Sequence, residues 1–146
     1  MYKHILIATD GSDLAQKGVD HGLSLAKNLA AKVTVVTVTE PFPVYVGDGW
    51  ALGPDELDRY EADQRKSALD IFESIKASAD RLGVPCETLH VPGRRPAEAI
   101  LEVSATKGCS LIVMASHGRR GLGRLLLGSQ TQEVLAGSSI PVLVVR

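Results

Sequence analysis

The sequence is poor in aromatic residues, and its charges nearly cancel. Aromatic side chains make up 4% of the 146 residues, too few for the stacking platforms that bind single-stranded nucleic acids. The formal net charge is −1, whereas nucleic-acid-binding proteins usually carry a basic excess. We therefore expect no nucleic acid among the partners of this protein.

Cysteine is also scarce, and long apolar runs are missing. Cys86 and Cys109 are far apart and lack CxxC spacing, a usage typical of buried thiols in a reducing compartment. No apolar run approaches the roughly 20 residues that cross a bilayer. The N-terminus, MYKHILIATD, enters a strand-like segment without signal-peptide organisation. These features predict a cytoplasmic protein that does not contact a membrane.

The recognised motifs of catalysis and of phosphate binding are missing as well. The histidines lack HxxxH spacing, and no GxSxG nucleophile elbow occurs. Asp48, Asp55 and Glu56 could help to hold a metal, but solvated loop acids explain them better. GxxxxGK[ST] and GxGxxG are both absent. We therefore do not expect an enzyme.

What the sequence has is a regular alternation of strand and helix signals. Short apolar runs rich in β-branched residues, typical of strands covered on both faces, occur at 4–8, 32–38, 86–91, 110–115 and 141–145. Apolar residues recur at helical spacing in four segments, several of which have capping residues at their ends. The first segment follows Ser12 or Asp13, the second spans 54–82, the third has Pro96 in its first turn, and the fourth spans about 124–137. This order predicts a single α/β domain over residues 1–146, with a five-stranded parallel sheet and helices on both faces.

Two of the predicted strands have features of sheet edges, and one segment has the composition of a long loop. The strand at 86–91 is more polar than the others, which places it at a sheet edge. The strand at 141–145 is short and apolar, so at an edge it would be poorly defended. Pairing with the same strand of a second copy would satisfy it; otherwise it is interior or covered by a loop. Residues 40–54, rich in proline and glycine, predict a long loop that is either functional or disordered.

Two segments that follow strands have the composition of an anion site. They are ATDGS after the first strand and ASHGRRGLG, continuing to a Gly-Ser pair, after the fourth. Ligands of open parallel sheets lie at the carboxyl ends of the strands, where the strand order reverses. Glycine lets backbone N–H groups approach an anion, and a helix N-terminus favours it. The composition predicts a phosphate cradle; the alternative is a glycine-rich turn with solvated arginines.

The segments ILIATDGS, LIVMASHGRRGLGRLLLGSQTQEVL and IPVLVV, in this order and spacing, resemble the universal stress protein family over essentially the whole chain. The resemblance implies a Rossmann-like α/β sheet in the order 3-2-1-4-5. It implies a homodimer formed through the fifth strands, residues 141–145. In one branch of the family it also implies ATP bound at the carboxyl ends of the first and fourth strands.

The ATP-binding branch has the pattern Gly-x2-Gly-x9-Gly-Ser/Thr. Gly118 and the pair Gly128-Ser129 match its second half, and Ala115 replaces its first glycine. A φ that only glycine tolerates at position 115 would exclude the ligand, whereas an ordinary strand-end φ would not. We expect ATP, with AMP or a cyclic nucleotide as alternatives that share the adenosine contacts.

The resemblance also implies a role for each site residue. Asp10 would contact the ribose hydroxyls, and the backbone of Val38 would meet the adenine edge. The residues that would line the strand ends or surround the phosphates are Ala8, Thr9, Met114, Ala115, Gly118, Arg119, Gly128, Ser129 and Gln130. His117 lies in the same loop and either touches a phosphate or packs the loop. The alternatives are a capping or turn role for Asp10 and a core role for Val38.

These features together predict a homodimeric stress-response sensor or switch that binds ATP, with Mg²⁺ or Mn²⁺ carried by the phosphates. The alternative is an interaction protein of the same fold that binds no nucleotide and acts through its dimer surface and the loop 40–54. An enzyme such as a phosphotransferase or slow ATPase is a third reading, for which the sequence offers no base and no metal-binding carboxylate pair.

Overall fold

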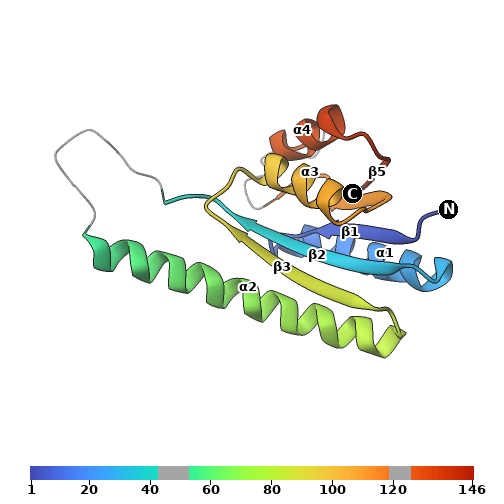
Figure 1. Cartoon of the computed structure of the whole chain (residues 1–146), viewed down its shortest axis with the longest axis horizontal. Helices are drawn as coiled ribbons and strands as arrows, with labels where there is room; N and C mark the ends of the chain where they lie inside the picture. The colour runs from blue at the N-terminus through green and yellow to red at the C-terminus, as the bar shows by residue number, and fades with distance from the viewer. Residues whose placement is uncertain (43–52, 119–125) are drawn as a thin grey trace.

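The computed structural model describes residues 1–42, 53–118 and 126–146. Strands and helices alternate along these residues (Figure 1): β1 (His4–Ala8), α1 (Asp13–Leu29), β2 (Lys32–Thr39), α2 (Pro54–Leu82), β3 (Cys86–Pro92), α3 (Pro96–Thr106), β4 (Leu111–Ala115), α4 (Ser129–Gly137) and β5 (Val142–Val145). All five strands run parallel in the order β3-β2-β1-β4-β5. This confirms the α/β fold and the strand order, and it places the more polar β3 at an edge as predicted.

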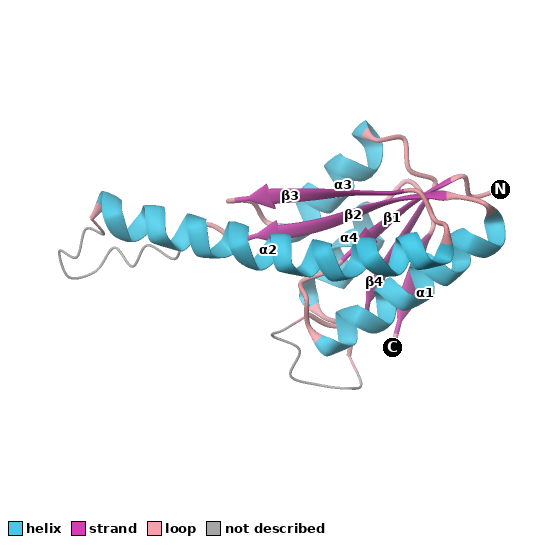
Figure 2. Ribbon diagram, turned by 90° about the horizontal axis from the view of Figure 1, so that it is seen from below, coloured by secondary structure: helices cyan, strands magenta, loops and turns pink. Residues whose placement is uncertain are grey.

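The sheet is covered by two helices on each face. Side chains alternate along the central strand, so that Ile5 and Ile7 pack under α1 and α2 while Leu6 packs under α3 and α4. Figure 2 shows α1 and α2 on the near side of the sheet, with α3 and α4 behind it. Burial on both faces explains the nearly continuous apolar runs of β1 and β4.

The helix ends follow the predicted capping signals in α1 and α2. Ser12 caps α1, since its hydroxyl oxygen accepts a hydrogen bond of 3.2 Å from the Ala15 N–H. Gly83 ends α2 with a left-handed backbone, φ +70°, a conformation that glycine adopts without strain. Within the described residues, no helix combines the length and apolarity needed to span a bilayer.

The last helix is shorter than the sequence predicted. It begins at Ser129 rather than near residue 124, because Gly128 has the extended backbone of an N-cap, with ψ 153°. Residues 126–128 precede the helix without belonging to it, and 124 and 125 lie outside the described residues. The apolar run that precedes Gly128 imitates helical periodicity, whereas the Gly-Ser pair is the signal of the true start.

Candidate functional site

A cleft opens at the carboxyl edge of the sheet, where β1 and β4 lie side by side and the strand order reverses. Its volume is about 440 Å³, within the range of small-molecule sites. Its lining comes from the ends of β1, β2 and β4, from the first turns of α1, α3 and α4, and from one side of α2. Three helix N-termini therefore border a single cleft.

Every predicted site residue that the structure describes lines this cleft. They are Ala8, Thr9, Asp10, Val38, Met114, Ala115, His117, Gly118, Gly128, Ser129 and Gln130. Arg119 lies outside the described residues, as do the two other arginines of its loop, Arg120 and Arg124. Most of the loop 40–54 is also outside them, although Glu40 lies in the cleft wall. Sequence segments that are far apart are thus brought together.

The end of β1 is fixed by two hydrogen bonds to β2. The Thr9 N–H donates to the Val36 carbonyl at 3.0 Å, and the Thr37 hydroxyl donates to the Thr9 carbonyl at 3.0 Å. Polar backbone groups of successive strand residues point to opposite sides, so Val38 faces the same side as Val36. β1 pairs with β2 only as far as Ala8, and the Val38 backbone therefore points past the end of β1, into the cleft.

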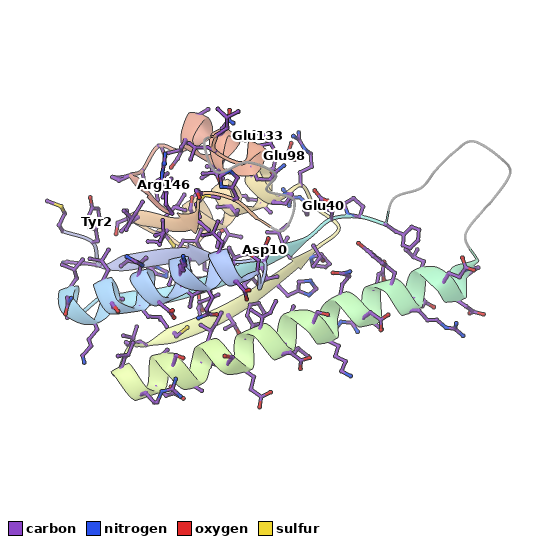
Figure 3. The ribbon with its side chains drawn as sticks, turned by 180° about the vertical axis from the view of Figure 1, so that it is seen from behind. Tyr2, Asp10, Glu40, Glu98, Glu133 and Arg146 are labelled. Atoms are coloured by element: carbon purple, nitrogen blue, oxygen red, sulfur yellow. The ribbon has the colours of Figure 1, made fainter. Side chains whose placement is uncertain are left out.

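Asp10, labelled in Figure 3, lies in the turn between β1 and α1, at the carboxyl edge of the sheet. Its Oδ1 accepts a hydrogen bond of 3.0 Å from the Ser12 N–H, which is the turn role considered for it. Its Oδ2 points across the cleft, and a Cβ added to Gly118 would come within 2.7 Å of that oxygen. The turn therefore orients the carboxylate, and glycine at position 118 leaves the room that it needs.

Ala115 has an ordinary backbone conformation. Among the described non-glycine residues, only Ala30 has a positive φ. Ala115 pairs with Val145 as the last residue of β4 and is 6% exposed. The replacement of glycine at this position therefore causes no backbone strain, the condition under which the methyl group does not exclude a ligand.

The N-terminus of α4 is held against the end of β4. The Gly128 N–H donates to the Ser116 carbonyl at 2.8 Å, and the buried Thr131 hydroxyl donates to the Ala115 carbonyl at 3.0 Å and to the Ser116 carbonyl at 3.2 Å. A Cβ on Gly128 would lie 3.2 Å from the Ser116 oxygen. Ser129 then begins the helix with an exposed side chain. The first N–H groups of a helix have no acceptor within it, so α4 presents donors to the cleft.

Two predicted residues at this end have partners of their own. The Oε1 of Gln130 accepts a hydrogen bond of 2.9 Å from the Ala97 N–H and so caps α3. Nδ1 of His117 lies 3.1 Å from the Ser116 hydroxyl. The sequence pattern contained no signal for the contact between Gln130 and α3, because it depends on how two helices meet.

The α2 wall of the cleft was not predicted from the sequence. Its lining residues recur at helical spacing and are Tyr60, Gln64, Ser67, Ala68 and Ile71. The Tyr60 hydroxyl donates to the Glu40 carbonyl at 3.0 Å, and its ring meets that of Phe42 edge to face at 4.8 Å. Polar side chains interrupt the apolar stripe of α2 at these positions, and this was the signal available. In the described part of the chain, no group of three or more His, Cys, Asp or Glu could hold a metal ion.

Comparison with known proteins gives consistent matches over the whole chain. The model of the universal stress protein family matches residues 1–146. Universal stress protein YxiE of Bacillus subtilis is 36% identical over 149 residues, covering 100% of both chains. The structure of MJ0577 from Methanocaldococcus jannaschii is 30% identical with a TM-score of 0.86, covering 99% of this chain and 96% of that one.

Two further structures share the fold at lower identity. A universal stress protein in complex with cAMP has a TM-score of 0.69 at 24% identity, covering 99% of this chain and 97% of that chain. A family protein of Arabidopsis thaliana with AMP bound has a TM-score of 0.68 at 15% identity, covering 98% and 90%. At these identities the likeness shows the fold alone.

Proposed function

The chain belongs to the universal stress protein family, and from this premise we propose that its cleft binds an adenine nucleotide, with ATP as the ligand. The protein would then act as a stress-response sensor or switch. The observation that carries the proposal is the cleft itself, which joins the predicted residues of β1, β2, β4 and α4 around one volume of about 440 Å³. The cAMP and AMP complexes are properties of those relatives, and the proposal for this chain rests on its own residues.

The proposed pose runs along three neighbouring strand ends. Adjacent strands are about 4.8 Å apart, so the ends of β2, β1 and β4 span about 10 Å. The adenine lies over the end of β2 beside the Val38 backbone, the ribose lies at β1 near Asp10, and the phosphates extend toward Gly118 and α4. This order places the most negative part of the ligand at the N-terminus of α4, where the helix dipole and unpaired N–H groups favour it.

We propose that the protein binds ATP without a catalytic site dedicated to its hydrolysis. A Mg²⁺ or Mn²⁺ ion would be coordinated mainly by phosphate oxygens and water, as is usual for nucleotide-bound Mg²⁺. Slow ATP hydrolysis needs no dedicated catalyst and would be compatible with a switch. Cys86 and Cys109 are free thiols, and we propose a reducing, cytoplasmic location for the protein.

The first experiment is to measure the nucleotide content of the purified protein and then titrate it with ATP and Mg²⁺. We expect saturable binding, and we expect Gly118→Ala to weaken it at least tenfold, because the new Cβ would displace the Asp10 carboxylate. Gly53→Ala is the matched control, since a Cβ there meets no atom within 4 Å among the residues that the structure describes. No co-purified nucleotide and no saturable binding up to millimolar ATP would refute the proposal.

A second candidate, an interaction protein without a nucleotide, is supported by the exposed edge strand β5. Leu143 on this strand is 39% exposed. We propose that β5 forms a homodimer whether or not nucleotide binds, so dimerisation alone does not decide between the two functions. The ATP titration does.

A further inference from the structure

Gln64 on α2 is a partly buried side chain that lines the cleft. Its amide has no hydrogen-bond partner among the residues that the structure describes. The neighbouring polar group on the same helical face, the Tyr60 hydroxyl, is bonded to the Glu40 carbonyl. One turn further along, Ala68 is buried in the core. Gln64 therefore offers a donor and an acceptor to the cleft from between a fixed tyrosine and the core.

The hydrogen bond between Tyr60 and Glu40 is the reference for placing Gln64 along the direction of the strands. α2 runs antiparallel to β2, since it leads from the carboxyl edge of the sheet back to the start of β3 (Figure 1). From Tyr60 to Gln64, four residues of helix advance about 6 Å toward the amino edge of the sheet. From Glu40 back to Val38, two residues of strand cover about 6.6 Å in the same direction. Taking the Tyr60 and Glu40 backbones as level, Gln64 lies at about the position of Val38, and both residues line the same cleft, where the adenine is proposed to bind.

The Val38 backbone and the Gln64 amide match different edges of the adenine ring. The Val38 N–H and C=O point past the end of β1 and suit the N1 acceptor and the N6 amino group. An amide can form a second, bidentate pair with adenine, in which its oxygen accepts from N6 and its NH₂ group donates to N7. Guanine has an oxygen in place of the N6 amino group, so the amide oxygen would then face another acceptor.

We infer that Gln64 is a specificity-determining residue that reads the N6 and N7 positions of the base and selects adenine over guanine. The inference rests on the proposed function, since it concerns the same cleft. It adds a residue from α2, an element outside the glycine-rich pattern. Ser67, also on the cleft side of α2, lies a further turn from the proposed base position.

The test compares ATP with 7-deaza-ATP, in which a C–H group replaces N7, on wild type and on Gln64→Leu. Wild type should bind 7-deaza-ATP about fivefold more weakly than ATP, the effect of one net hydrogen bond. Gln64→Leu should bind ATP about tenfold more weakly than wild type, the effect of a lost bidentate pair. It should also bind the two analogues equally, because the group that reads N7 is gone.

Gln16→Leu is the control variant. Gln16 is an exposed glutamine of α1 that bonds to Asp20 outside the cleft, so its removal should leave both affinities unchanged. Equal binding of ATP and 7-deaza-ATP by wild type would overturn the inference while the proposed function stands, and this arm needs no variant. A preference for ATP that survives in Gln64→Leu would overturn it as well. Absence of binding by either nucleotide would instead refute the proposed function.

Discussion

His4 is a buried histidine at the amino end of the sheet, opposite the cleft. It is 7% exposed, and its Nε2 lies 2.7 Å from the Thr34 hydroxyl, which donates to Glu87 at 2.9 Å. Burial lowers the pKa of His4, and the nearby positive charge of Lys32 lowers it further. The folded protein therefore binds this proton less readily than the unfolded chain.

Stability should accordingly fall as the pH drops below about 6.5, the ordinary pKa of histidine, while changing little just above it. Below that pH the unfolded chain gains a proton that the folded state resists, with a limit of about 1.4 kcal/mol per pH unit for one group. His90 contributes in the same direction, because burial lowers its pKa too. Urea unfolding at pH 7.5 and 5.5 measures the effect, and His4→Gln should reduce the difference. An unchanged difference in this variant would remove His4 from the explanation.

Thr131 is the residue that fastens α4 to β4. Thr131→Val keeps the shape of the side chain but removes the hydroxyl that donates to the Ala115 and Ser116 carbonyls. We expect a loss of about 1–2 kcal/mol in the free energy of unfolding, together with weaker ATP binding, because the donors of α4 are no longer held in place. Thr88→Val on β3 is the control, since the Thr88 side chain has no hydrogen bond among the described residues. Equal losses in the two variants would contradict the role given to Thr131.

At the scale of elements, α3 and α4 are joined at their N-terminal ends. Gln130 of α4 caps α3 through Ala97. Arg95, the N-cap residue of α3, pairs with Glu98 at 3.2 Å and with Glu133 of α4 at 2.9 Å. Figure 3 shows Glu98 and Glu133 together on this side of the molecule. The ion pairs are exposed and contribute little, so the cap is the stronger connection.

Two substitutions of Gln130 separate its structural role from its predicted contact with phosphate. Gln130→Ala removes the acceptor for Ala97 and should cost about 1 kcal/mol of stability, as the loss of a helix cap does. Gln130→Glu keeps an acceptor oxygen, so it should remain nearly as stable as wild type. It should bind ATP more weakly, because the introduced negative charge would repel the phosphates. Thermal unfolding and ATP titration of both variants measure this. Full ATP affinity in Gln130→Glu would place the phosphates away from α4.

The succession of strands and helices was predictable because each element carries its own signal, whereas the strand order 3-2-1-4-5 was implied by the family resemblance. The β-branched runs of β1 and β4 reflect burial on both faces, and Ser12 marks the start of α1. The start of α4 was misplaced because a local apolar run imitated a helix. The polar side chains in the apolar stripe of α2 were the signal for the α2 wall, but they did not show that this part of the helix lies against the cleft. That Gln64 reaches the level of Val38 depends on how far α2 extends past the sheet, which is a property of tertiary packing.

At the scale of the whole molecule, the two edges of the sheet differ. β3 is an edge strand with polar side chains, and Glu87 on it pairs with Lys107 at 3.1 Å. β5 is short and apolar, and within the described chain it pairs only with β4. The cleft is built from one chain, so the β5 edge is free to serve association without changing the site.

We predict that two copies associate through β5 about a two-fold axis, because antiparallel pairing would satisfy both exposed strands at once. Leu143→Glu should shift a dimer to monomer, since it places two negative charges close to the axis. Leu69→Glu is the matched control: Leu69 is 59% exposed on α2, which packs on β3 at the opposite edge. Light scattering over a range of concentrations measures both. A wild-type monomer throughout, or equal dissociation of both variants, would refute the β5 interface. ATP affinity should survive in the Leu143→Glu monomer, because no cleft residue belongs to β5; its loss would mean that the second copy completes the site.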